Sequence, residues 1–207
     1  MSDVSTTSAP AGIGHAHEET SMGVDSRKLG MWGFIGSETL FFAALIVTYL
    51  IFKPVNEARP ENQLPHEILG IQFTAVLAAI LLASSLTMVL SIAAVRRNNQ
   101  RWFRIWLAAT IGLGLCFLGG QVYEFTHLYS EGLTLGSSLL GSTFFVLTGF
   151  HGTHVAIGVT WLSCVLWRGI KRGYSANDHM DVEIAGLYWH FVDLVWVAVF
   201  TLIYLLP

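Results

Sequence analysis

Two pairs of ionisable side chains lie inside apolar stretches of this sequence, where they could do chemistry. His151 and His154 stand three residues apart in FHGTHVAIG, and His190 and Asp193 stand three residues apart in YWHFVDL. Residues with this spacing share one face of a helix. Two imidazoles on one face could form half of a metal or haem site, or they could hydrogen bond to a neighbouring helix.

Membrane-spanning helices must position these side chains. The chain has 207 residues, of which 53% are hydrophobic and 12% are charged, whereas soluble domains carry about 25% charged residues. Apolar segments of about 20 residues can cross a bilayer core of about 30 Å, and strands of a membrane barrel would be about half as long. The sequence therefore predicts an all-α polytopic membrane protein with a bundle of five transmembrane helices, at about 29–52, 68–95, 105–129, 139–167 and 184–206.

The chain divides into a polar tail and one membrane domain. Residues 1–28 contain no apolar segment and are predicted to form a disordered cytoplasmic tail. Residues 29–207 are predicted to form the five-helix transmembrane domain. Three prolines in the segment KPVNEARPENQLPHE predict a break after the first span, because proline interrupts helices.

Loop charges predict the orientation of the bundle. Nine of the eleven Lys and Arg residues fall in the N-terminal tail, the second loop and the fourth loop, which lie on one side; Lys53 and Arg59 lie on the other. Cytoplasmic loops are enriched in Lys and Arg, so the N-terminus is predicted to be cytoplasmic and the C-terminus external. The net charge of −3 and the lack of a basic run give no sign of a nucleic-acid partner.

The depth of each ionisable side chain tests the metal hypothesis. The rise per residue gives these depths from the cytoplasmic ends of the helices: about 9 Å for His190, about 14 Å for Glu38 and Asp193, about 20 Å for His154, about 24 Å for His151 and about 29 Å for Glu124. A metal needs further ligands at one level, and His190 is about 11 Å shallower than His154. The depths favour histidines that hydrogen bond between helices over a metal or haem site.

The carboxylates are expected to differ in role. Glu38 and Asp193 come out at the same depth, which is compatible with a buried network joining the first, fourth and fifth helices. Glu38 could handle protons, bind a lipid headgroup or pin two helices through a hydrogen bond. Glu124 lies near the outer surface, which favours a solvated or interfacial carboxyl.

Small residues predict close helix contacts. Gly30, Gly33 and Gly36 line one stripe of the first span, and Gly149, Gly152 and Ala156 line a stripe of the fourth. Such stripes let helices approach closely in lipid. The stripe beside His151 and His154 is therefore expected to face another helix.

Four motifs resemble subunit III of haem–copper terminal oxidases. These are WGFIGSETLFF at 32–42, GQVYEFTHL at 120–128, TGFHGTHVAIG at 148–158 and YWHFVDLVWVAVF at 188–200. The resemblance covers about residues 29–206 and is to the short form of this subunit, which has five helices and lacks the first pair found in longer members.

The resemblance implies an accessory subunit in a bacterial-type plasma membrane. This chain would hold no haem, copper or catalytic residue, because the redox centres reside on subunits I and II. It would stabilise subunit I, bind phospholipid and support proton uptake in a cytochrome c oxidase that reduces oxygen to water coupled to proton translocation. The positions that match the family's polar residues are Glu38, Glu124, His151, His154, His190 and Asp193.

Other functions remain open at this stage. The electron donor of the complex could be a quinol instead of cytochrome c, and a larger respiratory supercomplex is a further candidate partner. A stand-alone membrane transporter or proton channel is the alternative from a different class, although the five spans show no clear internal repeat of the kind expected for transporters. A neighbouring chain could replace the two helices that the short form lacks.

Overall fold

The computed structural model of this chain describes residues 25–57, 71–132, 136, 139–176 and 178–205, without the side chains of 55–57, 140, 204 and 205. These residues form the helices α1 (Ser26–Glu57), α3 (Ile71–Arg96), α4 (Gln100–Ser130), α5 (Leu139–Lys171) and α6 (Met180–Phe200), with a π-helical turn at Thr201–Leu205. Four helices, α1, α3, α4 and α6, are long and apolar enough to cross a membrane. The chain is therefore an all-helical membrane protein.

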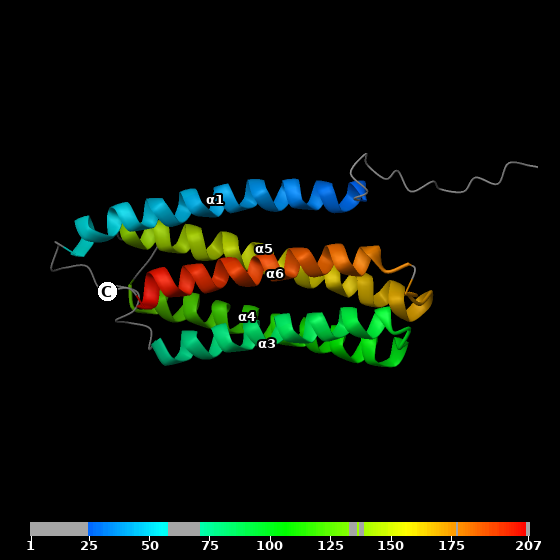
Figure 1. The fold of residues 1–207 in the computed structure, drawn as a ribbon. Coiled ribbons are helices and arrows are strands. Elements are labelled where there is room, and N and C mark those ends of the chain that lie inside the picture. Colours follow the sequence, from blue (N-terminus) through cyan, green and yellow to red (C-terminus); the bar gives the residue numbers. More distant parts are fainter. Residues whose placement is uncertain (1–24, 58–70, 133–135, 137–138, 177, 206–207) are drawn as a thin grey trace, which may run out of the picture.

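The helices lie side by side and alternate in direction. In Figure 1, α1 forms one edge of the bundle, α3 and α4 form the opposite edge, and α5 and α6 lie between them. Contacts agree with this order, since α1 packs against α5 and α6, α3 packs against α4 and α6, and α4 packs against α5. The α3–α4 turn is tight because Asn98 takes a left-handed conformation, which asparagine tolerates, and the Asn99 side chain accepts from the Trp102 amide.

On α3 and α4, buried residues recur at alternating steps of three and four, which is the spacing of knobs-into-holes packing. On α3 the buried stripe comprises Thr74, Leu77, Leu81, Ser84, Met88, Ser91 and Val95. On α4 it comprises Phe103, Leu107, Thr110, Gly114, Phe117, Gln121, Glu124 and Leu128. Each stripe mixes apolar residues with polar ones, so the helix contacts carry hydrogen-bonding groups as well as packing.

The first helix differs from its prediction at both ends. It begins at Ser26, so residues 26–28 belong to the helix instead of the tail, and it continues through Pro54 to Glu57. The helix runs past the predicted boundary at about Phe52. Pro54 lacks an amide hydrogen and so removes one backbone hydrogen bond, and the helix ends three residues after it. Residues 1–24 of the predicted tail and residues 58–70 of the following loop lie outside the described residues.

Only part of the small-residue prediction holds. A Cβ built on Gly30, Gly33 or Gly36 would meet no atom within 4 Å, so the α1 stripe makes no close contact with the described residues. On α5, a Cβ on Gly152 would lie 2.6 Å from Oε1 of Gln121 on α4, which marks a close approach, whereas a Cβ on Gly149 would meet nothing within 4 Å. The pattern alone could not reveal that the α1 stripe lies on the outward side of an edge helix.

Trp189 of α6 provides a direct test of the packing. A Cβ on Gly114 would lie 2.7 Å from Cη2 of this buried ring, whereas a Cβ on Gly112 would meet nothing within 4 Å. We expect Gly114→Ala to lower the free energy of unfolding by about 1–3 kcal/mol through overpacking. The matched control, Gly112→Ala, should be neutral or slightly stabilising, since alanine is the better helix former. Thermal unfolding of the purified protein in detergent measures both, and equal midpoints would contradict the packing described.

Candidate functional site

Glu38 of α1 and His154 of α5 meet across a helix contact. The His154 Nε2 atom lies 3.2 Å from Oε2 of Glu38, and the two side chains are 13% and 20% exposed. The His154 Nδ1 atom lies 2.8 Å from the Phe150 carbonyl oxygen and must donate to it, because a carbonyl only accepts. The Nε2–Oε2 contact then requires one more proton, carried by either the imidazole or the carboxyl. The pair therefore shares one proton and is neutral overall.

Aromatic side chains and a third helix enclose this pair. The Phe42 ring packs edge-on against the His154 ring, with centroids 5.0 Å apart, and Phe41 packs against Phe150 at 5.2 Å. From α6, the Tyr188 hydroxyl donates to the His154 backbone carbonyl at 3.0 Å. The proton-sharing pair is thus held where α1, α5 and α6 come together.

His151 lies one turn along α5 and has a different environment. Its side chain is fully buried, stacked on Trp196 with centroids 4.9 Å apart, and set against the edge of Phe117. Neither ring nitrogen has a hydrogen-bond partner among the described residues. The expected interhelical hydrogen bond of His151 is therefore absent from this part of the chain, because its neighbours are aromatic rings that offer no strong acceptor.

Asp193 of α6 does not join Glu38. It is 7% exposed and accepts a hydrogen bond from Ser85 of α3 at 2.7 Å. His190 lies on the same helix, half-buried and close enough to Asp193 for an electrostatic interaction. The equal depths of Glu38 and Asp193 left their pairings open. Among the described residues, Glu38 contacts His154 of α5, whereas Asp193 contacts Ser85 of α3.

Glu124 of α4 is buried instead of solvated. It is 2% exposed and accepts a hydrogen bond from Thr74 of α3. One turn away, the Gln121 side chain donates to the Thr148 carbonyl of α5 at 2.7 Å. Sequence reasoning missed Thr74, Ser85 and Gln121, although Thr74 and Gln121 lie on the three-and-four stripes, which is the signal that could have found them.

The arrangement can share protons and bind helices to one another. Among the residues that the structure describes, no group of three or more His, Cys, Asp or Glu side chains is placed to hold a metal ion. The Glu38 and His154 side chains are two such groups, from different helices. The next histidine along α5, His151, is not a third member, because its ring is stacked on Trp196.

The sequence model of the cytochrome c oxidase subunit III family matches residues 3–206. The chain belongs to this family. It is 41% identical to cytochrome c oxidase subunit 3 of a Synechocystis strain, over 99% of this chain and 84% of the relative. It is 38% identical to cytochrome c oxidase subunit 3 of Bacillus subtilis, over 91% and 90%, and 36% identical to quinol oxidase subunit 3 of the same organism, over 86% of each.

Family membership confirms the resemblance drawn from the four motifs. In this subunit III chain, the motifs supply at least one partner of each polar helix contact described above. The first motif carries Glu38, the second carries Gln121 and Glu124, the third carries Thr148 and His154, and the fourth carries Asp193. The motifs that carry the resemblance thus include residues that join the helices of this chain.

The two histidines of α5 should respond differently to replacement. His154→Phe removes the contact with Glu38 and should lower the free energy of unfolding by about 0.6 kcal/mol and at most about 1.7 kcal/mol, the range measured for hydrogen bonds in membranes. His151→Phe preserves the aromatic stack and removes two unpartnered nitrogens, so stability should be unchanged or higher. Unfolding in mixed micelles, with a double-mutant cycle between His154→Phe and Glu38→Leu, measures the coupling. A coupling free energy of zero would show that the pair does not join the helices.

Proposed function

We propose that this chain is the accessory, non-catalytic third subunit of a respiratory haem–copper oxidase that reduces oxygen to water coupled to proton translocation. The observation that carries the proposal is the family match over residues 3–206, with the family motifs located at the helix contacts. Haem and copper are expected on subunits I and II, and this chain stabilises subunit I. Cytochrome c is the proposed electron donor, since relatives at 38% and 41% identity are named cytochrome c oxidase subunit 3.

A quinol oxidase is the second candidate. A relative named quinol oxidase subunit 3 is 36% identical over 86% of this chain, a value close to those of the cytochrome c oxidase relatives. The donor would bind other chains of the complex, so a third subunit can resemble both types. A stand-alone transporter or channel has no comparable support.

We further propose that all five helices span a bacterial plasma membrane. α5 has 33 residues, or about 50 Å of helix, and packs against α1, α4 and α6. The start of α1, the α3–α4 turn and the α5–α6 loop lie at one end of the bundle, and these segments together with the adjoining helix ends hold nine of the eleven Lys and Arg residues. That end is assigned to the cytoplasm by the positive-inside rule.

Phospholipid binding is supported by a pocket near this end. The pocket has a volume of about 240 Å³ and is lined by Trp161, Cys164, Val165, Arg168, Tyr174, Asp181 and Ile184. Its apolar residues suit acyl chains. The Arg168 guanidinium, which pairs with Asp181 of the same lining, is the candidate phosphate ligand. The Tyr174 hydroxyl has no hydrogen-bond partner among the described residues, and burial raises the pKa of this hydroxyl, so it stays a donor.

Purification through an affinity tag on this chain tests the proposal. Two further subunits that carry haem and copper should co-purify, and the complex should consume oxygen with reduced cytochrome c in preference to quinol. Faster consumption with quinol would select the second candidate. Recovery of this chain alone from intact membranes, with no oxidase activity, would contradict both.

Glu38→Gln should separate a supporting role from a catalytic one. The amide can still contact His154 but carries no exchangeable acid proton, and the redox centres lie on other subunits. We expect the initial rate of oxygen reduction to stay largely intact while retained phospholipid or sustained proton uptake declines. Oxygen electrode traces, proton uptake by reconstituted vesicles and lipid analysis measure these outcomes. Loss of the haem spectrum in the purified complex would contradict the assignment.

A further inference from the structure

The first helix presents one narrow face to the bundle. Only 11% of the 18-residue apolar stretch of α1 is buried inside the bundle, against 56% of the corresponding stretch of α6. Its inward stripe follows steps of three and four residues and comprises Lys28, Met31, Ile35, Glu38, Phe42, Leu45 and Tyr49. Because the stripe repeats with each turn, apolar packing alone discriminates weakly between neighbouring axial positions of α1.

The bilayer also leaves the axial position of α1 loose. The apolar segment 29–52 is about 36 Å long as a helix, whereas the bilayer core is about 30 Å thick. A mismatch of this size costs only fractions of a kcal/mol per Å. The slack of about 6 Å is close to one helical turn, so the membrane does not define which turn of α1 faces which turn of α5.

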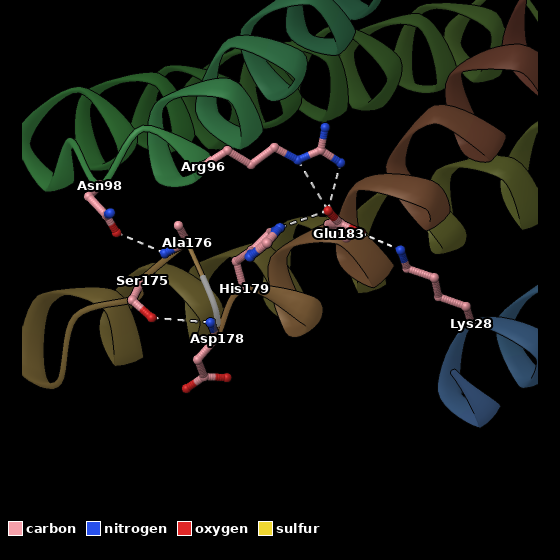
Figure 2. Close-up of polar contacts among 8 residues, drawn as sticks. All are labelled: Lys28, Arg96, Asn98, Ser175, Ala176, Asp178, His179 and Glu183. Atoms are coloured by element: carbon pink, nitrogen blue, oxygen red, sulfur yellow. Dashed lines mark hydrogen bonds and ion pairs between the residues drawn. The ribbon is translucent and has the colours of Figure 1, made fainter. Parts of the chain in front are cut away.

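Glu183, in the first turn of α6, connects three helices at the proposed cytoplasmic end (Figure 2). Its carboxylate lies 2.6 Å from Nζ of Lys28 on α1, 2.7 Å from Nη2 of Arg96 on α3, and 2.9 Å from Nε2 of His179, the residue before α6. The side chains of Glu183, Lys28 and Arg96 are 12%, 34% and 60% exposed, so solvent and salt screen the Lys28 contact less than the Arg96 contact.

The carboxylate is oriented independently of α1. Its Oε1 atom accepts from Arg96 and His179, which leaves Oε2 directed at Lys28. Figure 2 shows Lys28 approaching from the side of Glu183 opposite to Arg96. The rest of the bundle therefore presents a fixed negative charge to the start of α1.

We propose that the Lys28–Glu183 ion pair sets the axial register of α1, and so places Glu38 opposite His154. Lys28 and Glu38 are ten residues apart, or about 15 Å along the helix, and they pair with different helices, α6 and α5. A shift of one turn would move both groups about 5.4 Å from their partners. A single polar contact fixes register in the same way in coiled coils. Glu183 and Lys28 are thus positioning residues for the proton-sharing pair.

This inference goes beyond the proposed function, because it concerns the geometry of the chain whatever the electron donor. Disulfide trapping in the complex in its native membrane tests it, in a background with Cys116→Ser and Cys164→Ser. The pair Phe41→Cys with Phe150→Cys reports the observed register, in which the two native rings are 5.2 Å apart. Ser37→Cys or Leu45→Cys with Phe150→Cys reports a shift of one turn in either direction.

Neutralising the ion pair should redistribute the crosslinks. With Lys28→Met or Glu183→Gln, we expect the yield of the 41–150 disulfide to fall and that of the 37–150 or 45–150 disulfide to rise. Lys28→Arg should retain the wild-type pattern, as should Arg101→Met, which removes an exposed charge at the same end. If Lys28→Met protein fails to accumulate, the pattern of the near-isosteric Glu183→Gln protein decides.

Unchanged yields of all three disulfides in Lys28→Met and Glu183→Gln would overturn the proposal, since the other contacts of α1, among them Glu38–His154 and Arg27–Asp181, would then hold the register. A redistribution in Arg101→Met equal to that in Lys28→Met would also overturn it, because total charge would be the cause. These outcomes are independent of oxidase activity: crosslinks report register even if no haem-containing subunit co-purifies, and co-purification stands even if the register is unchanged.

Discussion

Helices in lipid gain little hydrophobic free energy from contacting one another, because the lipid tails are as apolar as their side chains. Polar groups that have left water must instead find partners inside the bundle. In this protein several of those partners come from a different helix, so each such contact selects a pair of neighbours. The selecting contacts include Glu38–His154, Ser85–Asp193, Thr74–Glu124 and Gln121–Thr148.

Close packing complements these contacts. The alternating steps of three and four residues keep one stripe of α3 and one stripe of α4 facing their neighbours, and glycines admit large rings at the contacts. Trp189 lies against both Gly114 and Gly158, and its indole donates to Ser84 at 3.0 Å. One side chain of α6 thereby contacts α3, α4 and α5, which explains why α6 occupies the middle of the bundle while α1 stays at its edge.

Composition and motifs were sufficient to predict the helical membrane class and the family, and the spacing of His151 and His154 placed them correctly on one helix. Partners were harder to predict, because depth counting assumes that helix ends are level. The end of α5 extends beyond the start of α1 (Figure 1). His154 therefore meets Glu38 although its depth, counted from the cytoplasmic end of its own helix, is greater. The burial of Glu124 and the pairing of Asp193 with Ser85 depend on helix rotation, which one sequence does not specify.

The contact between Glu38 and His154 has a consequence for how the bundle assembles. An ionisable group inside the bilayer is costly unless it is paired or close to water. Glu38 belongs to α1, whereas its partner belongs to α5, which follows α3 and α4 in the chain. The contact can therefore form only after α5 has been synthesised and inserted, so the carboxyl of α1 is made well before the imidazole that it meets in the finished bundle.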